Sequence, residues 1–179
     1  MYPLDIIRKF DEFLFQKKQC FEAVVIGGAA LSILGVISRE TRDVDVLSPG
    51  IPKDIMDSSI EFAKNIGLPS KNLKENWLNM GPGSLCRELP HGWENRAIDL
   101  FVGRAINLKT LGRIDFLMTK VLAYCDRGFD LQDCIKMNPS KEELKEILPW
   151  VQAYDGNPTW PEYVRHRMSE LARELGYEF

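Results

Sequence analysis

Three aspartates stand in short runs of strand-forming residues, at a spacing suited to holding a divalent cation. Asp43 and Asp45 alternate with valines, and Asp99 follows in a second apolar run. Because successive side chains of a strand point to opposite faces, the paired carboxylates project from one face while the valines bury on the other. Two like charges on one face repel each other, and a bound cation relieves that repulsion. If the strand of Asp99 pairs beside them, the three acids predict a metal site for phosphate chemistry.

A glycine pair precedes these acids. Gly27 and Gly28 end a run of β-branched residues and lead into an apolar segment that starts at Ala29. Backbone N–H groups at such a strand-to-helix turn suit a phosphate, although a tight turn alone is the simpler interpretation. The pair is neither a Walker loop nor a GxGxxG motif, since the Gly-Lys-Ser/Thr and the third glycine are absent. The order of glycine turn, paired acids and third acid is more specific than any one member.

Several other side chains leave two interpretations open. Arg39 and Arg42 flank the acids and would contact either phosphate or Glu40 and water. Trp77 and Trp93 bracket an irregular stretch, and burial in a core is favoured over stacking on a base. The paired aspartates themselves could be a strand end that faces solvent.

Composition limits the classes of function. The chain has 179 residues, a net charge of -3 and a pI of about 5.5, so its overall charge would not steer it onto nucleic acid or an anionic membrane. No apolar run approaches the roughly 20 residues of a membrane span, and the first residues lack the pattern of a secretory signal. The four cysteines have no CxxC spacing, which indicates buried thiols in a reducing cytoplasm.

The elements that must position these residues follow from hydrophobic periodicity. Strands are expected at 21–26, 43–47, 77–80 and 96–102, and helices at 3–19, 29–37, 53–66, 114–125, 131–137, 141–148 and 161–175. After Gly103 we expect helices only, with Ser140 and Glu143 as a capping box and Pro149 kinking or ending its helix. The predicted fold is α/β (α+β), a small mixed sheet flanked by helices and followed by an all-helical half. The domains would be an α/β core at 1–108 and a helical region at 109–179, packed as one unit.

The order of these motifs resembles the nucleotidyltransferase superfamily, which includes DNA polymerase beta and the antibiotic-modifying nucleotidyltransferases. Thr41-Arg42-Asp43-Val44-Asp45 is similar to the Thr-x-Asp-x-Asp form of bacterial toxin and abortive-infection types, and the segment from Lys120 to Asp133 is similar to the Lys…Ala…Arg…Lys-Asp-x-x-Asp segment of those families. The resemblance covers roughly residues 22 to 135. Two departures are Ala29, where many members carry Ser, and the 14 residues between Gly28 and Asp43.

This resemblance implies roles for the motif residues. Asp43 and Asp45 would hold one Mg²⁺ on the nucleotide phosphates and, with Asp99, a second near the acceptor, with Mn²⁺ as a substitute. Asp99 would also be the base for the acceptor hydroxyl. Without the resemblance, Lys120 is a solvated helix-face lysine; Asp130 and Asp133 favour a helix-end ion-pair network, although Asp133 is the position that the family pattern selects. The nucleotide-binding residues implied by the resemblance are Gly27, Gly28, Thr41, Arg42 and Lys120.

The function expected is Mg²⁺-dependent transfer of a nucleoside monophosphate from a nucleoside triphosphate to an acceptor, with release of pyrophosphate in the cytoplasm. The acceptor stays open among a small molecule, a protein and an RNA end. The alternative is a degenerate member that binds nucleotide or a partner, such as an antitoxin, without turnover. A DxD glycosyltransferase leaves the glycine turn and Asp99 unexplained, and a haloacid-dehalogenase phosphatase needs an apolar strand where 39–42 is polar.

Overall fold

The computed structural model describes residues 2–38, 41, 43–66, 73–81 and 83–179 of the chain. It divides into two compact units, 1–111 and 112–179, at a boundary three residues beyond the expected one. That the two units pack as one stays a prediction. The helices are α1 (Pro3–Gln16), α2 (Gly27–Ile33), α3 (Lys53–Ile66), α4 (Leu85–Glu88), α5 (Trp93–Arg96), α6 (Arg113–Arg127), α7 (Leu131–Met137), α8 (Lys141–Ala153) and α9 (Trp160–Glu174). The strands are β1 (Phe21–Ile26), β2 (Val44–Ser48), β3 (Leu78–Met80), β4 (Ile98–Val102) and β5 (Ile106–Thr110).

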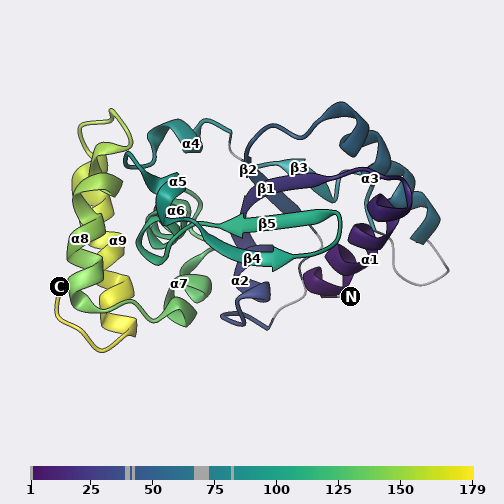
Figure 1. Ribbon diagram of the computed structural model, residues 1–179. Helices are drawn as coiled ribbons and strands as arrows, with labels where there is room; N and C mark the ends of the chain where they lie inside the picture. Colours follow the sequence, from purple (N-terminus) through teal and green to yellow (C-terminus); the bar gives the residue numbers. More distant parts are fainter. Residues whose placement is uncertain (1, 39–40, 42, 67–72, 82) are drawn as a thin grey trace. The chain divides into compact units, whose positions relative to one another are not determined.

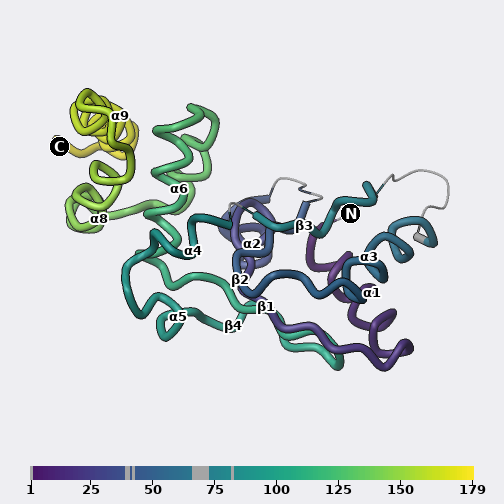
Figure 2. The backbone as a smooth tube through the Cα atoms, turned by 90° about the horizontal axis from the view of Figure 1, so that it is seen from above, coloured from purple at the N-terminus to yellow at the C-terminus, as the bar shows by residue number. Residues whose placement is uncertain are grey.

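The first unit is built on a mixed sheet with the strand order β3-β2-β1-β5-β4. β1 pairs antiparallel with β2 and parallel with β5, and β4 pairs antiparallel with β5. Helices α1 and α2 pack against each other, and α2 also packs on β1 and β2. Figure 1 shows β4 and β5 in front of these helices, and the view from above in Figure 2 agrees. The expected mixed sheet with flanking helices is confirmed.

An aromatic cluster fills the core on the helical side of the sheet. The apolar stripe of α1 buries Ile7, Phe10 and Leu14, as its spacing predicts. The ring of Phe10 lies 5.0 Å from that of Phe62 on α3 and meets Trp77 edge-on at 5.2 Å between centroids. The indole N–H of Trp77 donates to the Ser59 carbonyl at 3.1 Å, so this tryptophan is a core residue.

The expectation of helices alone after Gly103 is wrong, because a fifth strand follows. In β5 Ile106, Leu108 and Thr110 are buried while Asn107 and Lys109 are exposed, which is the period-two pattern of a half-buried strand. Its five residues are too short to dominate a window tuned to helical periods, and the hairpin that joins it to β4 contains Gly103. β5 lies between β1 and the strand of Asp99, which the sequence interpretation expected beside the paired aspartates.

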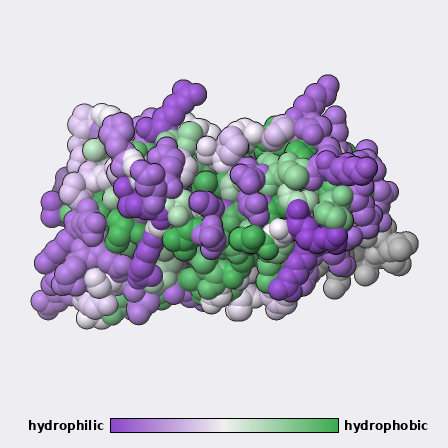
Figure 3. Space-filling view, in the orientation of Figure 1, coloured by the Kyte–Doolittle hydropathy of each residue, from purple (hydrophilic) through white to green (hydrophobic). Residues whose placement is uncertain are grey.

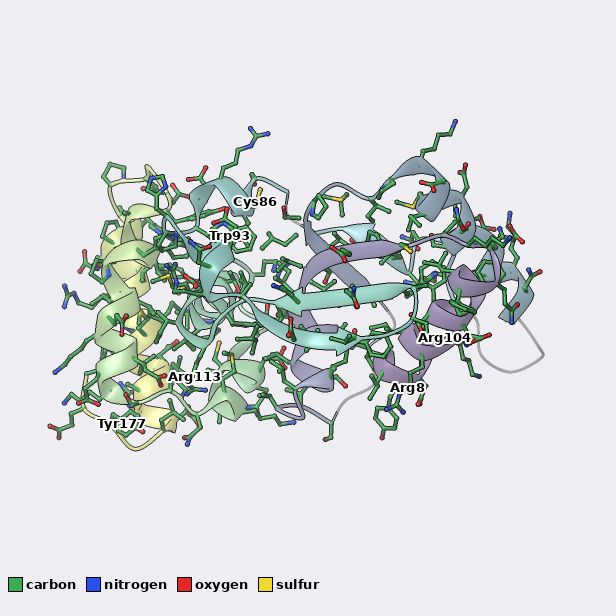
Figure 4. The ribbon with its side chains drawn as sticks, viewed as in Figure 1. Arg8, Cys86, Trp93, Arg104, Arg113 and Tyr177 are labelled. Carbon is green, nitrogen blue, oxygen red and sulfur yellow. The ribbon has the colours of Figure 1, made fainter. Side chains whose placement is uncertain are left out.

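A buried carboxylate on α1 holds the β4–β5 hairpin. The Asp11 side chain accepts hydrogen bonds from the backbone N–H groups of Arg104, Ala105 and Ile106, at 3.1, 2.8 and 2.7 Å. A Cβ on Gly103 would stand 2.3 Å from Asp11 Oδ1, so this turn needs a glycine. Arg104 continues outward, pairing with Glu12 at 3.1 Å beside α1 (Figure 4).

The second unit consists of α6 to α9. The capping box at the start of α8 is confirmed, because the Glu143 N–H donates to Ser140 Oγ at 3.1 Å and the Ser140 N–H donates to the Glu143 carboxylate at 2.8 Å. Pro149 does not end α8, which continues to Ala153. Arg113 of α6 forms a bidentate ion pair with Glu143 of α8, at 2.6 and 3.0 Å, and so connects the two helices.

The remaining differences from the sequence predictions are local. α2 begins at Gly27 and ends at Ile33, earlier at both ends than the expected helix, and residues 93–96 form α5 before the strand begins at Ile98. Cys125 and Cys134 are buried, as expected, whereas Cys20 is exposed. None of the helices in the described ranges is long and apolar enough to cross a membrane.

Candidate metal and nucleotide site

The paired aspartates lie at the start of β2 with the alternation that the sequence predicts. Val44 and Val46 are 1% and 0% exposed, whereas Asp43 is exposed and Asp45 is half-buried. Because the valines anchor one face of the strand in the core, both aspartates are kept on the other side. The pairing of Asp45 with Ile26 sets the acid at the end of β1, next to the glycine turn.

The carboxylate of Asp45 lies close to Gly27. Gly27 has a φ of 77°, a left-handed conformation that costs a residue with a side chain free energy. A Cβ at this position would stand 2.7 Å from Asp45 Oδ2, so the carboxylate occupies the space that the glycine leaves. α2 begins at this residue, and the first N–H groups of a helix have no partner within it. The structure therefore places a carboxylate beside backbone donors that suit a phosphate.

The other predicted residues of this site are only partly described. Gly28 is the second residue of α2, and Thr41 is half-buried in the segment before β2. Arg42 and Arg39 lie outside the described residues. Ala29 is fully buried, so its methyl group packs inside the unit.

Asp99 is not brought beside the other two acids. It lies on β4 opposite Lys109 of β5, and β5 pairs in turn with β1 at Val24. Two strands therefore stand between β2 and β4, and three spacings of about 4.8 Å put the Cα atoms of Asp45 and Asp99 on the order of 15 Å apart. Among the described residues no group of three His, Cys, Asp or Glu side chains is placed to hold one metal ion. Both β1 and the missed strand β5 lie between them, whereas the expected convergence required the Asp99 strand to lie next to the pair.

The residues present still fit a magnesium ion bound with a nucleotide. Mg²⁺ is commonly held by one or two carboxylates together with substrate phosphates rather than by an all-protein cage. Asp43 and Asp45 supply two carboxylates from one side of a strand, and the α2 start supplies phosphate donors next to them. The donor set is oxygen only, as Mg²⁺ prefers.

In the second unit Lys120 forms a buried ion-pair network. Its ammonium donates to Asp130 Oδ1 and to Asp133 Oδ2, both at 2.8 Å, and its side chain is 7% exposed. Arg127 contacts the other oxygen of Asp130 at 3.2 Å. The interpretation of Asp130 and Asp133 as an ion-pair network at the helix end is therefore confirmed, and Lys120 is a buried lysine rather than a solvated one. Its contact with phosphate stays a prediction.

Buried side chains elsewhere have packing roles. Trp93 is 3% exposed, and its indole N–H donates to the Cys86 carbonyl at 3.1 Å. The two residues are labelled in Figure 4. Burial raises the pKa of the Cys125 thiol to about 12, and burial also raises the pKa of Cys134. Both thiols are therefore protonated at neutral pH and are poor nucleophiles.

The sequence interpretation missed a groove beside Asp99. Asp99 lines a groove of about 640 Å³ together with Val24 and Lys109. The alternation from Ile106 to Thr110 was the signal that could have found it, because it puts Lys109 on the same side as Asp99.

The comparisons with known proteins gave one match. Residues 4–143 match the model of a protein family described as "Nucleotidyltransferase of unknown function (DUF6036)". No curated protein matches the chain, and no solved structure matches it. The match covers the whole first unit from α1 onward and reaches the capping box of α8. With the glycine turn, the paired aspartates and the mixed sheet in place, the chain belongs to this nucleotidyltransferase family.

Proposed function

We propose that the protein transfers a nucleoside monophosphate from a nucleoside triphosphate to an acceptor, with Mg²⁺ held by Asp43 and Asp45. The acceptor oxygen forms a bond to the α-phosphorus, the bond from that phosphorus to the bridging oxygen breaks, and pyrophosphate leaves. The proton of the acceptor hydroxyl passes to a carboxylate or to water. We place the reaction in the cytoplasm, where nucleoside triphosphates and Mg²⁺ are plentiful.

The observation that carries this proposal is the contact between Asp45 and the glycine turn. A triphosphate at the start of α2 would lie beside the Asp45 carboxylate, which fills the space next to Gly27. A triphosphate and the Asp45 carboxylate lying side by side repel each other strongly unless a cation lies between them. We therefore expect a divalent ion to strengthen phosphate binding at this site.

The residues of this chain would divide the work as follows. Backbone N–H groups at Gly27 and Gly28 orient the outer phosphates. Asp43 and Asp45 hold the Mg²⁺ ion that faces these phosphates. Bound Mg²⁺ would supply charge stabilisation to the oxygens of the displacement. Thr41 lies two residues from Asp43 and is half-buried, so it is suited to a phosphate contact at the edge of the site.

The roles inferred for Asp99 and Lys120 have less support. Asp99 as a ligand of a second ion, or as the base, would have to act across about 15 Å from Asp45, which is too far for a shared ion. Lys120 would have to exchange a buried carboxylate partner for a phosphate. We therefore rest the proposal on Asp43, Asp45 and the glycine turn.

The test is a transfer assay. The purified full-length protein is incubated with Mg²⁺, a cell lysate as the source of acceptors, and each α-labelled nucleoside triphosphate in turn. We expect label in one acceptor fraction with a matching release of pyrophosphate. Asp43→Asn and Asp45→Asn should each lower labelling at least a hundredfold, because one metal ligand is lost.

The control is Asp57→Asn, which removes the same charge from the exposed face of α3 and should label like the wild-type chain. Equal labelling by the Asp43 and Asp45 variants would refute this assignment. Binding of Mg²⁺ and nucleotide by calorimetry without pyrophosphate release would instead favour the degenerate member that binds without turnover.

A further inference from the structure

A groove lies on the side of the sheet opposite α2, apart from the paired aspartates. Its floor is formed by residues of β1, β5 and β4, and its two walls by Pro49 after β2 and by Trp93 and Glu94 of α5. At about 640 Å³ it falls within the size range of small-molecule sites. It lies wholly within the first unit.

The charge of this groove is predominantly negative. Three carboxylates line it, from Glu22, Glu94 and Asp99, against the single ammonium of Lys109. Asn107 donates to Glu22 at 3.1 Å. Within the described ranges, the carboxylates of Glu94 and Asp99 take part in no hydrogen bond and no ion pair. Both remain available to a ligand, and a polyanion entering the groove would be repelled.

Apart from Ser48, the rest of the lining is apolar. Val24 and Pro49 stand at one side and Val102, which is 72% exposed, at the other. Figure 3 shows hydrophobic surface between hydrophilic side chains on the face that carries β4 and β5. An exposed valine on an edge strand gains free energy when a ligand covers it.

We propose that this groove binds the acceptor, and that the acceptor is a small amphipathic organic cation. Its apolar body would lie on Val24 and Val102, and its ammonium or guanidinium group would contact Asp99 and Glu94. A cationic head gains from the two unpaired carboxylates, whereas an RNA end or an anionic metabolite would meet three like charges.

The position of the groove relative to the glycine turn supports the assignment of its ligand as the acceptor. Val24 in the floor of the groove is two residues before Ile26, the partner of Asp45, and two residues of a strand span about 7 Å. A ligand on Val24 would therefore reach toward a nucleotide at Gly27. Only the ligand's role as the acceptor rests on the proposed transfer reaction, because binding in the groove requires neither nucleotide nor metal.

Three probes with the same apolar body and different heads test the charge preference: phenylbutylamine, phenylbutanol and phenylbutyrate. Each is titrated into the full-length ¹⁵N-labelled protein at neutral pH, without nucleotide or Mg²⁺, and the indole N–H signal of Trp93 reports on the groove. We expect the amine to bind at least about threefold more tightly than the alcohol, and the carboxylate most weakly, since partly exposed ion pairs contribute modestly. Added salt should lower the preference for the amine.

Variants of the groove carboxylates test which residues cause the preference for the amine. Glu94→Gln and Asp99→Asn should each bring the amine-to-alcohol ratio closer to one, while Asp57→Asn, the same neutralisation outside the groove, should keep it. Glu94 is exposed on a short helix, so its variant should fold even if the Asp99 variant does not. Equal binding of the three probes, or an unchanged ratio in both groove variants, refutes the proposal.

Three further outcomes distinguish this proposal from a protein-binding groove and from the proposed transfer reaction. An arginine-rich peptide that shifts Trp93 while phenylbutylamine does not would mean a protein partner and would overturn the small acceptor. Preferred binding of the amine by a chain that shows no nucleotide transfer would uphold the groove and refute the transfer reaction. Transfer to an acceptor without any amine preference would do the reverse.

Discussion

Gly27 and Asp45 show how one backbone conformation can decide a site. The glycine adopts a φ of 77°, and the carboxylate of Asp45 occupies the volume where any other residue would carry a Cβ. The identity of residue 27 is therefore constrained twice, by the backbone and by its neighbour. Gly35 has nearly the same backbone conformation, with a φ of 73°, but nothing lies within 4 Å of its Cβ position.

This pair gives a matched prediction. Gly27→Ala and Gly35→Ala should each lower the free energy of unfolding by about 1–2 kcal/mol, the cost of a left-handed alanine. Only Gly27→Ala should also push the Asp45 carboxylate away and abolish stabilisation by Mg²⁺ with nucleotide. Urea unfolding with and without these ligands measures both effects, and a Gly27→Ala protein that keeps the ligand response would show that Asp45 is not a metal ligand.

We predict that Lys120 stabilises the folded protein, whether or not it also binds phosphate. Lys120→Met would remove the ammonium that pairs with the buried Asp133 and would leave Asp130 with its contact to Arg127, which should cost about 3 kcal/mol of unfolding free energy. Arg127→Met removes a partner of Asp130 that is 61% exposed and should cost less than about 1 kcal/mol. Chemical denaturation compares the two variants. Similar values for both would mean that the Lys120 network is not structural, and any loss of activity in Lys120→Met could then be ascribed to phosphate binding.

At the scale of elements, α1 and the β4–β5 hairpin depend on one side chain. Asp11→Ala would leave the buried N–H groups of Ala105 and Ile106 without their carboxylate and should lower the free energy of unfolding by about 3 kcal/mol. The adjacent Glu12→Ala breaks only an exposed pair with Arg104 and should change it by less than about 1 kcal/mol. Hydrogen exchange should locate the loss in β5, and unchanged protection there would contradict this account.

The contact between α6 and α8 predicts a dependence on pH. Hydrogen bonds from Arg113 lower the pKa of Glu143, the opposing effect of burial being smaller. A carboxyl group whose pKa is lowered by folding stabilises the protein above its unfolded pKa of about 4.3, and this contribution is lost as the pH falls through the folded value.

Glu143→Gln should therefore be less stable than the wild-type chain by about 1 kcal/mol near pH 6, and the difference should shrink below pH 4. Unfolding in urea across this range measures the difference, with Glu146→Gln, an exposed glutamate of the same helix, as the control. A difference that stays constant with pH would exclude the ion pair as its cause.

For the molecule as a whole, ligand binding should appear as a rise in melting temperature. Mg²⁺ with a nucleoside triphosphate should stabilise the first unit by about 2.7 kcal/mol at a hundred times the dissociation constant. Either component alone should do less, because the nucleotide and Asp45 repel each other without the ion. A thermal scan of the wild-type chain and of Asp45→Asn tests this, and an equal rise with nucleotide alone would remove the case for the metal.

Periodicity in the sequence determined most elements and the local part of the site. β1, α3 and α7 have the predicted bounds, since each has a clear pattern bounded by turn residues. The placement of Asp43 and Asp45 opposite two buried valines also follows from alternation alone, because the pattern repeats every two residues whatever the strand pairs with.

Only the tertiary structure decided which strands are neighbours. The order β3-β2-β1-β5-β4 separates Asp99 from the paired aspartates and makes it part of a groove with Lys109. The same strand order brings Asp45 against Gly27, 18 positions earlier in the chain. In the second unit, the packing of α6 and α7 buries Lys120 between two carboxylates. Alternation specifies the face on which a side chain lies, but strand order depends on long-range pairing and shared core volume, which no local pattern records.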